Sequence, residues 1–187
     1  DPAKLKKPGL KLLGGRQMEF IDHWIEDWEG AAMKVLLSQT IFANAATHHG
    51  GDKMFLYGDL DSGGWPKNPR DEVIRKIRKA FAFHISGDQH LPSLIQYGVD
   101  EYRDAGWSFC TPAITVGYER RFLPDRLDIE PRNRPDHNLA NTGEHEDLFG
   151  NKNYIYAVGN PGDDANDKNR YVQAEKRSSG FGLITFD

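Results

Sequence analysis

One short segment combines residue types that could hold a metal ion. Gly87-Asp88-Gln89-His90 follows an apolar run and places a carboxylate and an imidazole two residues apart. Alternate residues of an extended segment point the same way, so Asp88 and His90 could both face one ion. A carboxylate together with an imidazole suits a transition-metal site. A surface turn with an exposed histidine fits the same four residues, and spacing alone leaves both interpretations open.

Two further loops carry candidate ligands and acid–base groups. The loop from Asp59 to Trp65 holds two carboxylates, Asp59 and Asp61, among glycines, and hard cations prefer such oxygen ligands. Solvated acids in a turn would give the same pattern. Adjacent histidines do not readily bind one ion together, so of His48 and His49 we consider His49 as a ligand or acid–base group. An ordinary loop is the alternative.

Arginine residues are candidates for holding a phosphate, because a guanidinium group can form two parallel hydrogen bonds with phosphate oxygens. Arg70, Arg120 and Arg121 are considered for this role, although the last two would equally well be a surface pair. His84 lies inside the apolar run before Gly87, which is typical of a hydrogen-bonded core histidine. It is therefore left out of the predicted site.

Short elements separated by many loops must position these residues. Apolar residues at helical spacing predict a helix over residues 16–28. Asn68 as N-cap and Pro69 at the first helical position predict a second helix to about Lys79, with Val73, Ile74 and Ile77 buried. A long loop is expected over residues 123–150. Strands are expected over residues 33–37, 54–57, 80–86, 93–99, 107–114, 154–158 and 182–186.

The composition predicts one α/β domain without nucleic-acid or membrane character. The 187 residues suffice for one core, and their interspersed charges sum to −4, so no nucleic acid is expected as a stable partner. The longest apolar stretches, such as residues 33–37, are far too short to cross a bilayer, and no signal peptide precedes Asp1. The single cysteine, Cys110, cannot form an internal disulfide.

Several segments, taken in order, resemble the catalytic domain of the alkaline phosphatase D-like proteins, which belong to the calcineurin-like metallophosphoesterases. The segments extend over nearly the whole chain, and their order is as specific as their residues. They are Leu12-Leu13-Gly14-Gly15-Arg16-Gln17, Val35-Leu36-Leu37-Ser38-Gln39-Thr40, Asp61-Ser62-Gly63-Gly64-Trp65-Pro66, Gly87-Asp88-Gln89-His90, Thr142-Gly143 with Phe149-Gly150-Asn151, and Ala157-Val158-Gly159-Asn160-Pro161.

The resemblance implies that the chain is part of a four-layer α-β-β-α sandwich that hydrolyses phosphate monoesters or diesters. A multinuclear centre of iron, calcium or zinc ions at the strand ends would bind the phosphoryl oxygens and activate a water or hydroxide. His90 stands in the superfamily's final histidine-containing metal motif, with Asp88 in place of a histidine. Gln39 falls where many members have a metal-binding histidine. The predicted metal ligands are Asp61, Asp88 and His90, and the predicted catalytic residues are Gln39, His49 and Arg70.

The chain departs from the family pattern in two ways. Gly63 stands where the family usually has an Asp or Asn, so one ligand is missing unless Asp61 or water replaces it. The early metal motifs are absent, and Gly58-Asp59, which resembles one of them, follows the Gln39 strand and is set aside because its chain order is wrong. Residues 1–187 are therefore interpreted as the C-terminal portion of such a domain, with a second chain or segment supplying the N-terminal half.

Two other functions stay open at this point. The chain could be a non-catalytic binding or structural subunit that retains the fold, an alternative supported by Gly63. It could also be a different metal-dependent hydrolase in which His49 and Asp61 are the ligands. Family resemblance further implies a periplasmic or secreted location.

Overall fold

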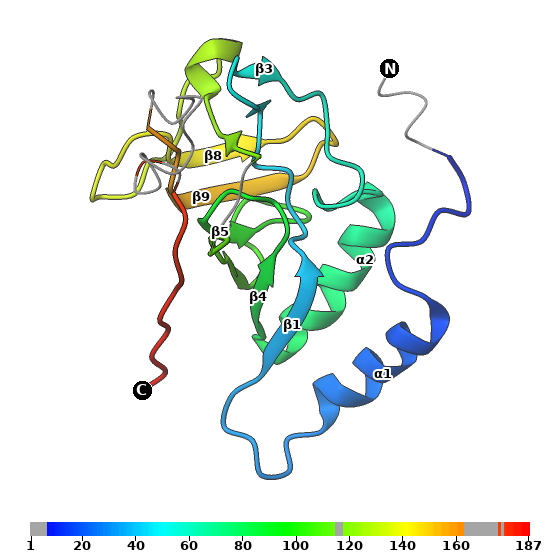
Figure 1. The fold of residues 1–187 in the computed structure, drawn as a ribbon. Helices are drawn as coiled ribbons and strands as arrows, with labels where there is room; N and C mark the ends of the chain where they lie inside the picture. Colours follow the sequence, from blue (N-terminus) through cyan, green and yellow to red (C-terminus); the bar gives the residue numbers. More distant parts are fainter. Residues whose placement is uncertain (1–6, 115–117, 163–175, 177) are drawn as a thin grey trace.

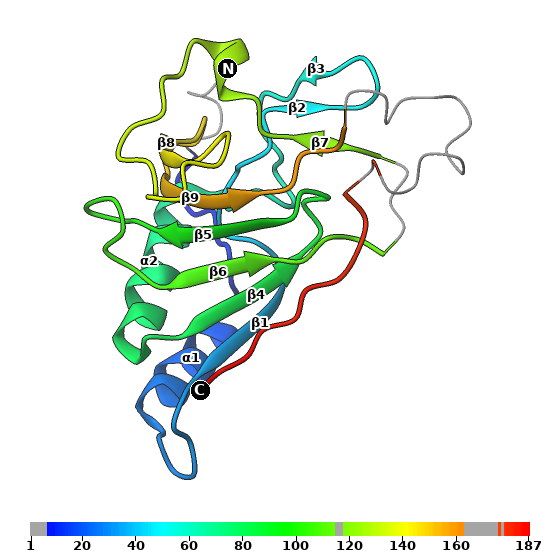
Figure 2. The same ribbon diagram turned by 90° about the vertical axis from the view of Figure 1, so that its left-hand side faces the viewer.

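The computed structural model describes residues 7–114, 118–162, 176 and 178–187. It shows a mixed α/β protein with a six-stranded mixed sheet and a small three-stranded sheet, which confirms the predicted class. Two α-helices, α1 (Gly15–Glu26) and α2 (Lys67–Ile77), lie on one face of the large sheet, and the C-terminal segment runs along the other (Figures 1 and 2). Within the described chain, neither helix has the length and apolar character of a membrane span.

The strands are short, and each extends over two to seven residues. The large sheet contains β1 (Val35–Thr40), β4 (Phe83–Gly87), β5 (Ser93–Tyr97), β6 (Trp107–Cys110), β8 (Gly143–Glu146) and β9 (Lys152–Val158). The small sheet contains β2 (His48–His49), β3 (Met54–Phe55) and β7 (Arg120–Arg121), and two 3₁₀ turns, η2 (Arg78–Ala80) and η3 (Pro124–Leu127), complete the set.

Several predicted boundaries are wrong for identifiable reasons. The segment 123–150 is not one loop, because η3 and β8 form within it; β8 is a four-residue strand without a run of alternating apolar residues. His48 and His49 form β2 instead of a loop, since two residues are too few to give a strand pattern. Residues 182–186 form no strand, although the prediction for 154–158 is confirmed by β9.

Helix α2 begins two residues before the predicted position. Its N-cap is Pro66 in an extended conformation, and Asn68 does not cap it, because the Pro66 carbonyl already accepts the Arg70 backbone N–H at 2.9 Å. The predicted buried stripe is confirmed, since Val73, Ile74 and Ile77 are all buried. This stripe holds α2 against the sheet, and burial of such side chains stabilises the fold by roughly 1.5–3 kcal/mol each.

The strand order of the large sheet is β1-β4-β6-β5-β9-β8. Strands β1, β4 and β6 are parallel, whereas β5, β9 and β8 each pair antiparallel with a neighbour. Parallel strands end at the same edge of a sheet, and here Thr40 pairs with Gly87. The residues that follow β1 therefore meet the segment that follows β4, at the end where the small sheet lies (Figure 2).

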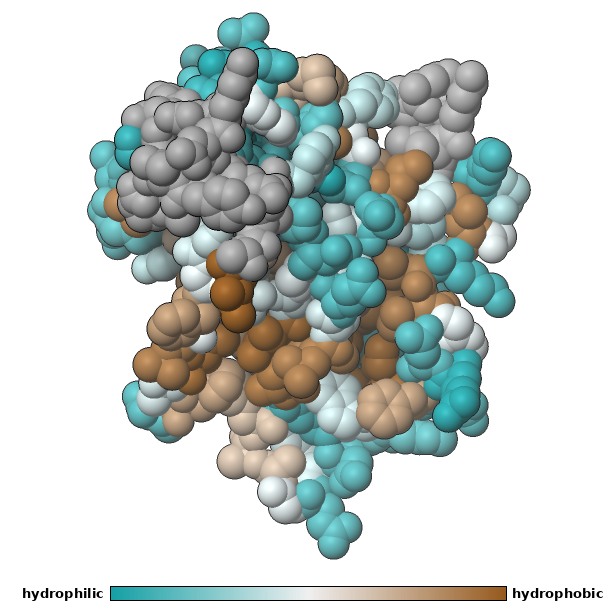
Figure 3. Space-filling model, in the orientation of Figure 1, coloured by the Kyte–Doolittle hydropathy of each residue, from teal (hydrophilic) through white to brown (hydrophobic). Residues whose placement is uncertain are grey.

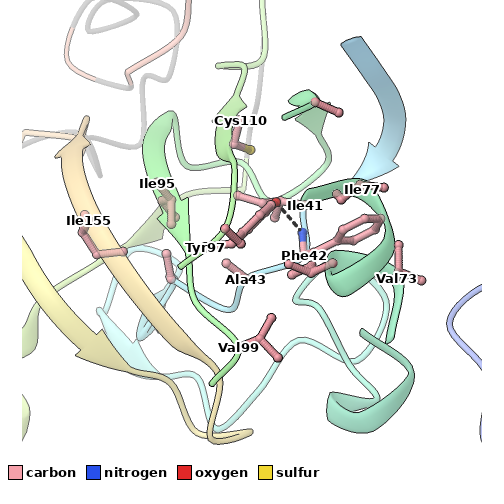
Figure 4. Packing of buried hydrophobic residues seen from close by; sticks show 14 of the residues in the cluster. Ile41, Phe42, Ala43, Val73, Ile77, Ile95, Tyr97, Val99, Cys110 and Ile155 are labelled. Atoms are coloured by element: carbon pink, nitrogen blue, oxygen red, sulfur yellow. Dashed lines mark hydrogen bonds between the residues drawn. The ribbon is translucent and has the colours of Figure 1, made fainter. Parts of the chain in front are cut away.

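The core lies between the two helices and the large sheet, and the segment after β1 is part of it. Residues 41–48 are buried along their whole length. Figure 4 shows Ile41, Phe42 and Ala43 among side chains from α2 and the sheet, with the Phe42 N–H donating to the Tyr97 hydroxyl at 3.0 Å. A buried loop needs such partners for its backbone groups, and here they fix the chain that leads from β1 toward the candidate site.

The two faces of the large sheet differ in character. Strand register aligns one apolar row on the face away from the helices: Leu37, Ile85, Phe109, Leu94 and Ala157. The neighbouring row on the helix side is Leu36, His84, Ser108, Ile95 and Ile155, and its last four members are fully buried. The apolar row is only half-buried, and Leu37 is 73% exposed.

The C-terminal segment covers part of this apolar face without closing it. Gly182 lies so close to the Phe109 ring that a side chain there would clash, and Phe186 packs edge-on against Phe83 with ring centroids 5.7 Å apart. Phe181 and Leu183 remain 85% and 89% exposed. Figure 3 shows the resulting hydrophobic region over β1, β4 and the C-terminal segment. The segment therefore covers some apolar surface of the sheet and exposes apolar side chains of its own.

Candidate metal centre

The segment after β4 is a tight turn and not the extended stretch that the spacing argument assumed. Asp88 and His90 both have left-handed backbone conformations, with φ of 66° and 54°. Between them, Gln89 is fully buried and donates from Nε2 to the carbonyls of Ala43, at 2.7 Å, and Ser62, at 3.0 Å. Non-glycine residues rarely adopt this conformation, and its occurrence at both residues makes the turn tight.

In this turn the two predicted ligands lie nearer to solvent, whereas Gln89 is anchored in the core. Asp88 is exposed and His90 is partly exposed. The His90 ring lies 2.8 Å from the Tyr118 carbonyl through Nδ1. A carbonyl oxygen can only accept, so Nδ1 carries a proton and Nε2 is the ring nitrogen left for another partner. Metal-binding histidines commonly make this hydrogen bond from the nitrogen that does not bind the metal.

Gln39 joins this turn from the end of β1. Its Nε2 donates to Asp88 Oδ2 at 3.2 Å. Next to it, the Thr40 hydroxyl donates to the Asp61 backbone carbonyl at 3.1 Å. The structure therefore brings Gln39, Asp61 and Asp88 to one edge of the sheet, as the sequence predicts. An open hollow of about 540 Å³ lies alongside, lined by residues of β1 and β4 together with Asp88 and Thr111.

Asp59 and Asp61 form a carboxylate pair beside the turn. Burial acts to raise the pKa of Asp59, but hydrogen bonds with Asp61 and Ser62 and the Arg120 charge outweigh it, so the pKa lies below its usual value. The Asp61 pKa is raised, chiefly by the hydrogen bond with Asp59 and its charge; burial and the charge of Asp88 add to the effect. Asp61 therefore protonates first, while Asp59 stays ionised against Arg120.

Gly63 cannot supply the missing family ligand without a change in the loop. A Cβ atom at this position would lie 2.5 Å from the Asp59 carbonyl oxygen and 2.9 Å from Asn44 Oδ1. Both atoms belong to buried residues, so the loop is packed tightly around the glycine. Asp59 and Asp61 are the carboxylates that this packing leaves at the site.

Tyr118 lies between His49, on β2 of the small sheet, and His90, which follows β4 of the large sheet. Its hydroxyl hydrogen-bonds with His49 Nδ1, and its carbonyl accepts from His90. The Arg120 guanidinium lies 4.9 Å from the Tyr118 ring centroid and forms an ion pair with Asp59. His49 is thus one residue removed from the proposed ligands, on β2, and it reaches them through Tyr118.

The structure does not bring Arg70 to this edge. Its side chain is fully buried on α2, and it donates to the carbonyls of Phe42, at 2.9 Å, and Gly98, at 2.7 Å, and to Asp71 at 2.8 Å. These contacts occupy the guanidinium in the core. The loop-anchoring role of Arg70 is structural, and the arginine next to the predicted ligands is Arg120.

The predicted site left out Tyr118, Arg120 and Asp59, although the sequence analysis considered Arg120 for a phosphate and Asp59 as an oxygen ligand. Asp59 was set aside on chain order, yet the fold places it beside Asp61. Tyr118 gives no signal in the sequence, because it acts through its position next to β7. Among the described residues, no three or more His, Cys, Asp or Glu side chains are placed so that they could hold a metal ion. Asp61, Asp88 and His90 are therefore not arranged as one complete ligand set within this range.

Comparison with known proteins adds no relative. The chain matches no family model, and no curated protein or solved structure matches it. The resemblance to the metallophosphoesterases therefore stays a prediction from the sequence segments.

Proposed function

We propose that this chain contributes to metal-dependent hydrolysis of phosphate monoesters or diesters, as part of a larger enzyme of the alkaline phosphatase D-like kind. The observation that supports this best is the turn at Asp88 and His90. It directs an imidazole, whose Nδ1 is held by the Tyr118 carbonyl, and a carboxylate outward from the end of a parallel strand, which is where open α/β sheets place ligand sites.

The donor set fits a metal ion that accepts nitrogen and oxygen ligands. Within the described residues His90, Asp88 and Asp61 are not grouped around one ion, so each would contribute a single ligand, His90 through Nε2 and the two aspartates through carboxylate oxygens, to a centre that further ligands complete. A bound ion of this type supplies charge that polarises a phosphoryl group and lowers the pKa of a water molecule. A proton on Asp61, which its raised pKa favours, would compete with such an ion.

Other residues of the chain orient these groups. Gln39 holds Asp88 through a hydrogen bond, and the Tyr118 carbonyl fixes the His90 ring. Arg120 keeps Asp59 ionised and places a positive charge beside the site. Because that guanidinium is already paired, its role toward a phosphate is mainly electrostatic. His49 is placed for proton transfer through the Tyr118 hydroxyl.

The finer architecture belongs to the same proposal. The face that carries Leu37, Ile85 and Phe109 would pack against a second α/β layer, which completes the four-layer sandwich. Support comes from the apolar row on this face, since soluble proteins rarely leave a large contiguous apolar patch uncovered. The partner layer, on a second chain or segment, would supply the metal ligands that the described residues lack.

Hydrolysis of p-nitrophenyl phosphate and bis(p-nitrophenyl) phosphate by the native assembly tests the function. We expect activity that a chelator abolishes and that added metal restores. His90→Ala should lower kcat at least about 100-fold. His23→Ala, an exposed histidine on α1, is the matched control and should leave activity unchanged. Activity that persists in the presence of chelator, or in His90→Ala, would contradict the proposal.

A non-catalytic subunit is the second candidate function. The packing around Gly63 supports it, because the loop excludes the carboxylate that the family usually has there. This candidate predicts a stable complex without activity and without bound metal. The third candidate, with His49 and Asp61 as the ligands, receives less support, because His49 lies on β2 and is separated from the Asp61 loop by Tyr118.

A further inference from the structure

The buried histidine on β4 is part of a continuous hydrogen-bonded chain through the sheet. His84 is fully buried, and its ring lies between two hydroxyl groups. Nδ1 is 2.8 Å from the Tyr97 hydroxyl and Nε2 is 2.7 Å from the Ser38 hydroxyl. These partners come from β5 and β1, so the chain links three strands.

The hydrogen bonds of the chain, together with burial of the ring, assign the proton of His84. The Phe42 N–H donates to the Tyr97 oxygen at 3.0 Å, and burial favours the neutral ring, in which Nδ1 accepts from the Tyr97 hydroxyl. At the other end, the Ser38 hydroxyl donates to the Thr40 carbonyl at 2.6 Å, so it accepts from His84 Nε2. His84 is therefore neutral, with its proton on Nε2. Burial agrees with this state, since it lowers the His84 pKa to about 3.

The chain ends at an irregularity in β1. Register shifts between Leu37 and Thr40: Leu37 pairs with Ile85, but Thr40 pairs with Gly87, so β1 has one extra residue here. Such bulges re-aim side chains and are frequent next to active sites. The bond from the Ser38 hydroxyl to the Thr40 carbonyl spans this bulge.

The residues that the bulge aims are those of the candidate metal centre. Gln39 lies in the bulge and contacts Asp88, and the Thr40 hydroxyl contacts the Asp61 carbonyl. We propose that His84 is a positioning residue, which holds the Ser38 hydroxyl so that the bulge directs Gln39 and Thr40 into the site. The metal-binding part of this inference rests on the proposed function. The hydrogen-bonded chain through His84 and its effect on the Gln39 side chain do not.

Nuclear magnetic resonance of the metal-free full chain tests the hydrogen-bonded chain through His84 and the positioning. The His84 ring nitrogens should report the Nε2–H tautomer, and Ser38→Ala should shift the Gln39 side-chain amide and the Asp88 backbone amide. Ser93→Ala is the matched control, because Ser93 is a buried strand serine whose hydroxyl has no hydrogen-bond partner within the described residues. Ser38→Thr keeps the hydroxyl and should restore the Gln39 and Asp88 signals.

Mn²⁺ binding measured on the same variants tests whether the positioning affects metal affinity. Ser38→Ala should weaken Mn²⁺ affinity roughly 10- to 100-fold, as loss of outer hydrogen bonds does at metal sites, while Ser38→Thr and Ser93→Ala bind as the parent chain does. An Nδ1–H or cationic His84, or Gln39 and Asp88 signals in Ser38→Ala no different from those in Ser93→Ala, would overturn the inference. If the parent chain binds no Mn²⁺, the proposed metal centre fails, and the resonance measurements still decide the positioning role.

Discussion

The two faces of the large sheet differ in how deeply their side chains are buried and in how polar they are. On the helix side, His84 and Ser108 are fully buried among apolar neighbours, and His84 is held by hydroxyl partners. On the other face, Leu37, Ile85 and Phe109 align as an apolar row that stays half-exposed. The buried side thus contains polar groups, and the open side contains apolar ones.

This contrast separates the packed face of the sheet from the face that remains open to solvent. Burial of a polar group costs free energy unless its hydrogen bonds are made, and the helix side meets that requirement at His84. Exposed apolar surface loses the stabilisation that burial would give, and the proposed partner layer would supply that burial. The candidate metal centre lies where both faces end, so it would share the partner layer with the apolar row.

The largest expected effect on the free energy of unfolding concerns Arg70, the buried arginine of α2. Arg70→Met should destabilise the chain by about 3–5 kcal/mol, because it leaves two buried carbonyls without their donor and Asp71 with Lys67 as its remaining partner. Urea unfolding followed by circular dichroism measures the change. Arg75→Met, at an exposed ion pair with Asp100, should cost less than about 1 kcal/mol. Equal costs at both positions would show that Arg70 does not anchor the core.

A matched pair of truncations compares the two faces directly. Ile95→Ala, on the buried row, should cost about 2–5 kcal/mol in the free energy of unfolding. Leu37→Ala, on the open row, should cost less than about 0.5 kcal/mol in the isolated chain. Both values come from chemical denaturation of the 187-residue chain. A Leu37 cost as large as that of Ile95 would mean that the open face is already covered.

Acid should weaken the chain through its buried histidines. Burial lowers the pKa of His84 to about 3 and that of His145 to about 4, below the ordinary value of 6.5. Between pH 6.5 and these values the unfolded chain binds more protons than the folded chain. Stability therefore falls as the pH falls from 6.5 to 4, by on the order of 3 kcal/mol for His84.

Denaturation at a series of pH values checks this slope. His84→Gln should flatten it, because the substituted side chain has no proton to bind. Acidic groups titrate in both proteins, so the difference between the two curves isolates His84. Identical slopes in the parent chain and in His84→Gln would contradict a buried neutral ring.

Cys110 provides the smallest effect, which is on reactivity. It is fully buried on β6, and burial raises the pKa of its thiol to about 11. The thiolate is the reactive form, so the folded chain should not react with a disulfide reagent at pH 8. Unfolding in guanidinium should release one reactive thiol per chain. Rapid labelling of the folded chain would show that this part of the helix side opens to solvent.

Much of the secondary structure follows from local patterns, and the exceptions have clear causes. Apolar spacing predicts α1, α2 and the parallel strands, because these elements bury a regular stripe. Strands β2, β7 and β8 escape prediction, since they are two to four residues long and depend on neighbours distant in sequence. The run at 182–186 reads as a strand, but it packs on the apolar face without strand pairing.

The candidate site follows the same division. Asp88, His90, Gln39 and Asp61 were predicted from residue type and family segments, and strand topology brings them to one edge. Arg70 was predicted from chemistry alone, and its burial could not be foreseen from its neighbours in sequence. Tyr118 contacts His90 through its backbone carbonyl, which every residue has, so no sequence pattern could predict this contact.

Bound metal in the native assembly tests the central claim most directly. Elemental analysis after purification without added metal should find iron, calcium or zinc in the parent protein. His90→Ala should lose at least one ion per chain, and His23→Ala should keep the full content. An assembly that is metal-free, or that retains its metal unchanged in His90→Ala, would contradict a metal centre at the ends of β1 and β4.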